Sequence, residues 1–420
     1  ARGYQMETTS DTEVILCAYM AYGPSFVTRL NGIFAFAIWD GARQTLRLYR
    51  DRLGVKPLFY ARRGETLIFG SEPKALFRHP LVEPAADADS FREIFGVGPA
   101  RTPGCGVFRD LHELRPGFCA AFSRDGFAER AYWTLEAREH TDSYEETVEK
   151  TAWLLRDAVQ RQMVSDVPVC SFLSGGIDSS VVTALASNFL ERQGKQLHTF
   201  SFDFAHNAEC FRPNAFQPTQ DRPYVERMLA CYPLRHTCLS CEEAVLADLL
   251  PQAVRIRDLP GMTDVDASLL YFCGRVRQHE KVALTGECAD EIFGGYNVYS
   301  EPGGSAYDKL PRGLRRGIGH IAEKMPAHRG RNFFVRKGKD LEERFIGNAY
   351  MFTPAERKAL LKIRTNAPDP MAVTKPFYDK VQDQDDVTKM QYLDLHLWMA
   401  GDILLKADKM SMANSLEVRV

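Results

Sequence analysis

The sequence predicts two domains of different class: a β-rich α+β domain first, then an α/β domain built on a doubly wound parallel sheet. Two observations predict this order. Up to about Trp133, short apolar runs alternate with glycine-containing or charged turns, as in antiparallel sheets. Beyond about Tyr144, a strand, a glycine turn and a helix follow one another repeatedly, which is typical of a parallel sheet covered by helices. A length of 420 residues fits two domains.

The first domain is expected to hold one helix and a meander of short antiparallel strands. The helix is predicted over 12–22, with Ser10 or Asp11 available as its cap. Turn pairs such as Asn31-Gly32 separate apolar runs with alternating faces. These runs predict strands over 33–39, 45–50, 57–60 and 66–69.

The polar stretch 136–143 has no apolar period, so we place a linker there and domains over 1–135 and 144–420. A long amphipathic helix is predicted over 144–163, with an apolar face of Val148, Trp153, Leu154, Leu155 and Val159. Beyond it, strands are predicted over 167–173, 197–202 and 281–285, and helices over 179–191 and 224–231. The chain from about 302 onward is expected to be mainly helical.

Composition excludes several classes of protein. Hydrophobic residues make up 45% and charged residues 26%, which excludes a disordered chain, and a net charge of −2 provides no global field for nucleic acid or acidic lipid. No apolar run has the length of a membrane span. Ten scattered cysteines favour reduced thiols in a cytoplasmic protein, and the single Cys238–Cys241 pair is weak evidence for zinc. Because the chain begins with alanine and stops within a structured pattern, we expect a fragment at both ends.

The first candidate site is a glycine turn over 174–180, directly after a predicted strand. Open α/β sheets bind ligands at the carboxyl ends of their strands. Gly175 and Gly176 let the backbone approach an anion, and the helix that follows favours phosphate at its start. Asp178 would repel bare phosphate, and a divalent metal that bridges the two removes this difficulty. The simpler alternative is a helix cap, but the full pattern, with Ser174, Ser179 and Ser180, favours polyphosphate binding.

The second candidate site is the turn over 284–295, again after a predicted strand. It brings three carboxylates, Glu287, Asp290 and Glu291, to the start of a helix. A carboxylate at the start of a helix interacts favourably with the helix dipole. This interaction explains the presence of one carboxylate there better than the presence of three. If both turns face one crevice, Asp178 and Asp290 can share Mg²⁺, which is a hypothesis about their distance.

The two glycine turns resemble those of a known family, the glutamine-hydrolysing asparagine synthetases. The 174–180 run is similar to the pyrophosphate loop of N-type ATP pyrophosphatases, and the second turn resembles the matching loop of these synthetases. The resemblance covers essentially the whole chain. Segments 10–16, 30–40 and 50–60 look like the glutaminase domain, and 405–419 looks like the C-terminal region. It implies an incomplete N-terminal Ntn-hydrolase (αββα) domain, a class II glutamine amidotransferase, before an ATP pyrophosphatase domain with added helices.

The resemblance also implies an activity. Members release ammonia from glutamine, pass it through an internal tunnel, and let it attack an aspartyl adenylate made with Mg-ATP. Asp11 would hold the amino group of glutamine, and Glu287 would assist formation or capture of the adenylate. ATP would be bound by Leu173, Phe202, Thr285, Gly286 and the loop Ser174, Gly175, Gly176, Asp178, Ser179 and Ser180, with Mg²⁺ on Asp178 and Asp290. The substrates are small molecules, with no nucleic acid or membrane as partner, and a homodimer stays open.

The departures from the family limit this expectation. The family's nucleophilic cysteine is residue one of the mature protein, and residue one here is alanine, so this chain as written is not expected to hydrolyse glutamine. Asp402, Lys406 and Lys409 share a helical face that by default is ion-paired and solvated, although the resemblance favours a place for them in the lining of the cleft. Two rivals stay open: the same adenylation on another carboxylate, as in a β-lactam synthetase or a peptide cyclase, and a non-catalytic nucleotide-binding relative.

Overall fold

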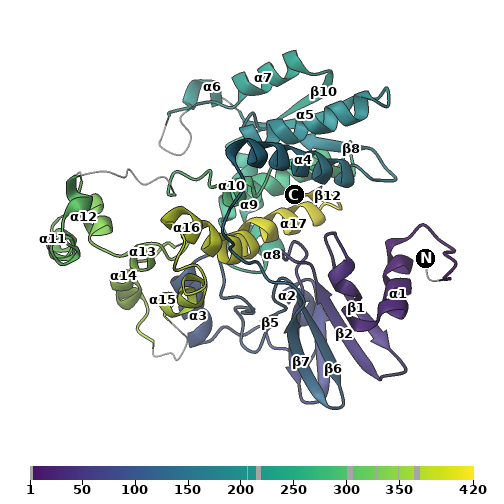
Figure 1. Ribbon diagram of the computed structural model, residues 1–420, viewed down its shortest axis with the longest axis horizontal. Helices are drawn as coiled ribbons and strands as arrows, with labels where there is room; N and C mark the ends of the chain where they lie inside the picture. Colours follow the sequence, from purple (N-terminus) through teal and green to yellow (C-terminus); the bar gives the residue numbers. More distant parts are fainter. Residues whose placement is uncertain are drawn as a thin grey trace. The chain divides into compact units, whose positions relative to one another are not determined.

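The computed structural model describes residues 3–205, 207–213, 219–299, 306–326, 330–348, 350–363 and 369–420. The chain divides into two compact units. Unit 1 comprises Ala1–Asp87 and Pro103–Glu136, and unit 2 comprises Ala88–Thr102 and Ala137–Val420. The elements of both carry their labels in Figure 1. The domain limits drawn from the sequence at 135 and 144 remain a prediction.

Unit 1 is built on two antiparallel sheets. The larger has the order β1-β2-β6-β7, formed by β1 (Ala35–Asp40), β2 (Thr45–Arg50), β6 (Phe118–Ser123) and β7 (Gly126–Ala131). The smaller has the order β4-β3-β5, formed by β3 (Phe59–Arg63), β4 (Thr66–Gly70) and β5 (His112–Glu113). Helix α1 (Asp11–Tyr22), the 3₁₀ turn η1 (Gly23–Arg29) and the short α2 (Pro73–Leu76) complete the unit. The predicted helix and strands are all present, with ends displaced by a few residues.

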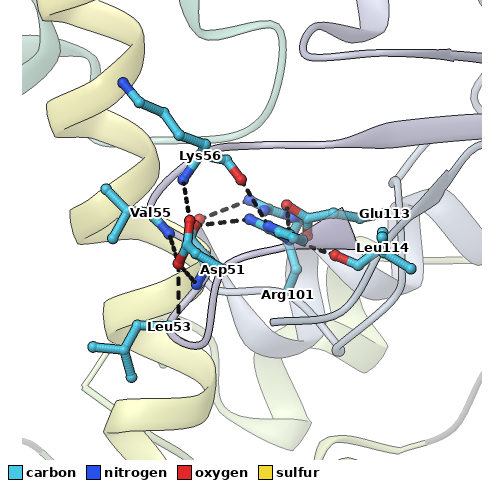
Figure 2. A network of polar contacts seen from close by, with 10 residues as sticks. Asp51, Leu53, Val55, Lys56, Arg101, Glu113 and Leu114 are labelled. Carbon is cyan, nitrogen blue, oxygen red and sulfur yellow. Dashed lines mark hydrogen bonds and ion pairs between the residues drawn. The ribbon is translucent and has the colours of Figure 1, made fainter. Parts of the chain in front are cut away.

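A buried charged loop follows β2 (Figure 2). Asp51 is 2% exposed, and its carboxylate accepts hydrogen bonds from the backbone N–H groups of residues 53–56. Arg50 donates to the carbonyl of Leu114 at 2.6 Å and pairs with Glu113 at 3.0 Å. A buried charge is tolerated only when it is paired and hydrogen-bonded, as here. These contacts fix the connection from β2 to β3.

Unit 2 is built on a five-stranded parallel sheet with the order β10-β9-β8-β11-β12. Its strands are β8 (Val169–Phe172), β9 (Leu197–Phe204), β10 (Leu234–Cys241), β11 (Val282–Leu284) and β12 (Glu417–Arg419). The sequence predicted β8, β9 and β11 and missed the two edge strands. Helix α4 (Tyr144–Gln162) precedes β8. The helices between β8 and β11 are α5 (Ile177–Glu191), α6 (Asn207–Cys210), α7 (Arg222–Cys231), α8 (Glu243–Arg257) and α9 (Thr263–Val276).

The remainder of unit 2 is helical, as predicted. It includes α3 (Ala88–Val97) from the earlier part of the chain and then the following segments: α10 (Ala289–Phe293), η2 (Ala306–Lys309), α11 (Arg312–Lys324), α12 (Arg331–Lys337), α13 (Leu341–Arg344), α14 (Pro354–Leu360), α15 (Pro370–Tyr378), α16 (Asp386–Asp394), the π-helical η3 (Leu395–Ile403) and α17 (Leu404–Met412). Among the described residues, no helix is both long and apolar enough to cross a membrane.

The two faces of the parallel sheet pack into separate cores, because successive side chains of a strand point to opposite faces. Val169 and Leu284 pack with residues of α4 and α5. Their strand neighbours Cys170 and Ala283 pack with residues of α9. The apolar face predicted for α4 is only partly correct: Val159 is buried, whereas Trp153 is 60% exposed. Helices thus cover both faces of the sheet and leave its carboxyl edge to the loops (Figure 1).

Candidate active site

The loop after β8 has the shape expected of a phosphate-binding turn. Gly175 has a φ of 87°, and a Cβ there would lie 2.7 Å from the backbone oxygen of Asp221, so only glycine fits. The side chains of Ser174 and Ser179 meet at 2.9 Å and hold the turn closed. Gly176 is the N-cap of α5. Because the first amides of a helix have no intrahelical partner, the loop offers N–H groups to an anion.

The loop after β11 lies directly against the first loop. A Cβ on Gly286 would lie 2.6 Å from the backbone nitrogen of Ser179 and 2.8 Å from the carbonyl carbon of Asp178. The two backbones therefore touch at Gly286, where no side chain intervenes. The N–H of Thr285 donates to the carbonyl of Arg419 at 3.0 Å, so the edge strand β12 anchors this second loop. Both predicted glycine turns thus belong to one place, the carboxyl edge of adjacent strands β8 and β11.

Negative charge gathers where the loops meet. Asp178 and Asp290 are partly buried, and burial raises the pKa of both carboxyl groups. The negative charges of Asp178 and Glu287 raise the pKa of Asp290 further. A cation bound between these carboxylates would relieve the repulsion between their charges. Two carboxylates together with substrate phosphates are the donors that Mg²⁺ usually takes. Three or more metal-ligating side chains do not gather anywhere in the described parts of the chain, so phosphate oxygens would have to complete such a site.

A buried lysine faces the second loop. Nζ of Lys406, on α17, lies 3.5 Å from Oε2 of Glu287, whose N–H donates to the hydroxyl of Thr285 at 3.3 Å. Asp402, Lys406 and Lys409 are only 2%, 9% and 2% exposed, so the default prediction of a solvated face is wrong. The alternative, that they line the cleft, stays a prediction. Their burial depends on how this helical segment packs against the rest of unit 2. The positions of the three residues along the helix do not reveal that packing.

The third carboxylate of this loop is held within the fold. Glu291 is 1% exposed and accepts a hydrogen bond from the hydroxyl of Tyr296 at 2.5 Å. The side-chain amide of Gln391, on α16, donates to the carbonyl of Ile292 at 3.1 Å. Helix α10 is therefore fixed from two sides. Because Glu291 is held within the fold, Glu287 and Asp290 are the carboxylates of this loop that can face a ligand.

The remaining predicted site residues occupy different environments. Leu173 is fully buried, and its N–H donates to the carbonyl of Phe200 at 2.8 Å. Of its two backbone polar groups, the carbonyl is therefore the one that could contact the adenine base of a nucleotide. Phe202 is half-buried on β9, the strand next to β8. Asp11 belongs to unit 1, where it lies exposed in the first turn of α1. The neighbouring Ser10 caps that helix by accepting from the N–H of Thr12 at 3.2 Å.

Comparison with known proteins shows which families the two parts of the chain resemble. The profile of the family described as "Asparagine synthase" matches residues 150–420, and that of the "Glutamine amidotransferase domain" matches residues 1–133. The chain is 42% identical over 421 residues to the glutamine-hydrolysing asparagine synthetase 3 of Bacillus subtilis (strain 168), covering 100% of this chain and 64% of that protein. It is 34% identical over 425 residues to asparagine synthetase 1 of the same organism, with the same coverage. It is 31% identical to the amidase chyE of Penicillium rubens over 71% of this chain and 45% of that protein.

These matches confirm the predicted fold classes, an Ntn-hydrolase domain followed by an α/β ATP pyrophosphatase domain. The chain spans somewhat less than two thirds of the length of the curated synthetases that it matches.

Proposed function

Because the chain belongs to the asparagine synthase family, we propose that the protein makes asparagine from aspartate and ATP, with ammonia as the nitrogen source. The observation that supports this most is the close approach at Gly286, which joins two strand-end loops and their carboxylates in one site. Helix-start amides next to paired carboxylates suit a triphosphate bound with a divalent ion. Asp178 and Asp290 would hold Mg²⁺, which supplies charge neutralisation for the polyphosphate when bound.

The chemistry requires activation of a carboxylate, because a carboxylate oxygen is a poor leaving group. In the proposed first step, the β-carboxylate of aspartate attacks the α-phosphorus of ATP, and pyrophosphate leaves, which gives β-aspartyl-AMP. Ammonia then attacks the acyl carbon, and AMP leaves with the bonding electron pair as asparagine forms. The loop amides and serines over 174–180 would hold the phosphates in line for the first step. Glu287 would assist formation or capture of the adenylate.

Unit 1 would supply the ammonia in the complete protein by hydrolysing glutamine, as the amidotransferase match suggests. Asp11 would hold the α-amino group of glutamine through an ion pair at the start of α1. Ammonia in water at neutral pH is mostly unreactive ammonium, so an enclosed route to the adenylate would keep the nucleophile reactive. A cytoplasmic location and a homodimer belong to the same proposal and rest on the family alone.

The test is product analysis with the purified chain. Incubation with ATP, Mg²⁺, aspartate and ammonium chloride should give AMP, pyrophosphate and asparagine in equal amounts. Asp178→Asn and Asp290→Asn should each lower the rate of AMP release by about 100-fold or more, because each removes a charge that stabilises the transition state. Asp248→Asn, an exposed carboxylate on α8, is the matched control and should keep the wild-type rate.

Two outcomes would overturn the proposal. AMP release only with an acid other than aspartate would favour a related adenylating enzyme. If the protein binds ATP but releases no pyrophosphate with any carboxylic acid offered as substrate, the result would favour a non-catalytic nucleotide-binding protein.

A further inference from the structure

The turn that follows α10 determines where the carboxylate of Asp290 lies. Gly294 ends the helix with a φ of 70°, and its N–H donates to the carbonyl of Asp290. The N–H of Gly295 donates to the same carbonyl at 2.9 Å. A Cβ on Gly295 would overlap Oδ1 of Asp290, so the carboxylate lies in the space that a side chain at this position would fill. The orientation of the carboxylate therefore depends on how this turn is held.

Tyr296 ties the end of the turn back to α10. Its hydroxyl donates to Oε1 of the buried Glu291 at 2.5 Å and accepts a hydrogen bond from Nε1 of Trp398 at 3.4 Å. Burial raises the pKa of Glu291, and the hydrogen bond from Tyr296 opposes this rise. The tyrosine thus satisfies a buried carboxylate and fixes the two ends of the segment 291–296 to each other.

One face of the continuous helical run α16–η3 holds this segment. The side-chain amide of Gln391 donates to two carbonyls of α10, at 3.1 and 3.3 Å. Asp394 accepts from the hydroxyl of Tyr299 at 2.6 Å, and Trp398 is the partner of the tyrosine in the turn. Gln391, Asp394 and Trp398 follow one another at spacings of three and four, which places them on the same side of the run.

Apolar packing alone is a poor anchor for α10. The helix has five residues, and its apolar side chains Ile292 and Phe293 are 51% and 57% exposed. A helix of this length is not stable without outside contacts. The hydrogen bonds to α16–η3 therefore carry much of the positioning. Trp398 belongs to the π-helical η3, and π-helical turns occur frequently at functional sites.

We propose that Tyr296, Gln391 and Trp398 are positioning residues for Asp290: together they hold the turn after α10 so that the Asp290 carboxylate faces the metal of a bound Mg-nucleotide. The three side chains act through Asp290 and do not touch the ligand. The proposal deepens the function proposed above and rests on it for the identity of the ligand, Mg-ATP.

The experiment compares the affinity for ATP in the presence of Mg²⁺ with the affinity in EDTA, by calorimetric titration. The ratio of the two Kd values measures what the metal contributes, and a general disturbance of the nucleotide site would change both values together. Tyr296→Phe removes both hydrogen bonds of the hydroxyl and should lower this ratio about tenfold. Gln391→Met and Trp398→Phe should each lower it about threefold. The Kd for ATP in EDTA should stay within about twofold of the wild type.

A double variant tests whether the effect passes through Asp290. Asp290→Asn should itself lower the ratio, because it removes the charge that the metal binds. When Asp290→Asn is already present, adding Tyr296→Phe should change the ratio by less than about twofold, since coupled positions are not additive. A merely structural role for Tyr296 would lower the ratio by the same factor with or without Asp290.

A further variant leaves the buried hydrogen bonds intact, in case Tyr296→Phe does not fold. Gly295 is exposed and does not have a left-handed backbone, so alanine is compatible with its conformation. Gly295→Ala would push the Asp290 carboxylate out of its place, and Mg²⁺ tolerates little deviation in ligand geometry. The ratio should fall about tenfold, with a melting temperature close to that of the wild type. Tyr144→Phe and Trp153→Phe, exposed on α4, are the matched controls and should keep the wild-type ratio.

The outcomes separate this proposal from the proposed function. A wild-type ratio in folded Tyr296→Phe and Gly295→Ala would overturn the positioning role, and so would a wild type whose affinity for ATP does not depend on Mg²⁺. The proposed function is decided by AMP release in the assay described above. A wild type that binds Mg-ATP with the expected dependence on these residues, but forms no asparagine, would support the positioning role and overturn the proposed function.

Discussion

Cys288 has a backbone conformation that side chains seldom adopt, and it lies inside the second site loop. Its φ is 74°, and it is the N-cap of α10, between Glu287 and Asp290 in sequence. A left-handed conformation costs a residue with a Cβ about 1–2 kcal/mol relative to glycine. The thiol is also buried, and burial raises its pKa. Cys288 therefore fills space as a small apolar group at a point where the chain changes direction.

This geometry predicts opposite results for two substitutions at the same position. Cys288→Val adds a branched Cβ to a left-handed residue and should lower the free energy of unfolding by about 2 kcal/mol or more. Cys288→Gly relieves the strain while removing a buried sulfur, so the two effects should cancel to within about 1 kcal/mol. Urea denaturation of both variants measures this. Equal destabilisation by valine and glycine would show that packing, and not backbone conformation, decides the position.

A buried carboxyl group predicts a pH dependence of stability. Burial raises the pKa of Asp394 to about 7, although its carboxylate accepts hydrogen bonds from the hydroxyl of Tyr299 at 2.6 Å and the N–H of Asn348 at 2.9 Å. Between about pH 4 and pH 7 the folded chain keeps a proton that the unfolded chain has released. The free energy of unfolding should therefore fall as the pH rises through this window, by roughly 4 kcal/mol at most.

Asp394→Asn should reduce this slope by the contribution of one proton, while other carboxyl groups whose pKa burial raises, such as Asp178 and Asp290, keep their share. The amide is neutral at every pH and can accept from Asn348 while it donates to Tyr299. Urea unfolding at several pH values between 4 and 7 gives the slope for each protein. Asp383→Asn, an exposed carboxylate, should keep the wild-type slope. The same slope in Asp394→Asn as in the wild type would assign the proton to another group.

At the scale of elements, the site depends on two loops that touch through a glycine. Gly286→Ala would place a methyl group 2.6 Å from the backbone nitrogen of Ser179, and backbone atoms cannot move aside cheaply. The loops after β8 and β11 should separate, and affinity for Mg-ATP should fall by about tenfold or more, as 1–3 kcal/mol of strain implies. Calorimetric titration measures the affinity.

The control for this change is Gly317→Ala on α11, where a Cβ would meet no atom within 4 Å. It should leave the affinity for Mg-ATP unchanged. Wild-type affinity in Gly286→Ala would mean that the loops can part without loss of the phosphate site.

The same elements show what the sequence could predict. Strands β8 and β11 are short apolar runs that end in glycine turns, so periodicity and turn chemistry located them and the loops after them. Strand β10 carries Arg235, His236 and Thr237 in succession, which hides an edge strand among polar residues. Strand β12 has three residues and exists because it pairs with β11. Local sequence carries no signal for such a pairing.

The candidate site divides in the same way. Asp178, Glu287 and Asp290 sit in the loops themselves and were predicted from their spacing. The sequence left Lys406 between a solvated face and the lining of the cleft, because its position depends on how α17 packs after the π-helical η3. Residues that reach a site from a distant helix are found only once the tertiary structure is known.

At the scale of the whole molecule, the two units have separate cores. The clusters around Phe26 and Leu48 are composed of unit 1 residues alone. The clusters around Phe200, Leu197 and Ala267 are composed of unit 2 residues alone. Among the described residues, each unit thus has apolar cores of its own, which favours independent unfolding. All of the residues proposed to bind ATP belong to unit 2.

This separation predicts two thermal transitions, of which Mg-ATP shifts one. A ligand that binds only the folded state at 100 times its Kd adds about 2.7 kcal/mol to stability, which raises the melting temperature of a unit of this size by roughly 4 °C. Differential scanning calorimetry with and without Mg-ATP measures both transitions, and Asp178→Asn in the same titration should show little shift. A single transition, or a shift of both by the same amount, would mean that the units unfold together despite their separate cores.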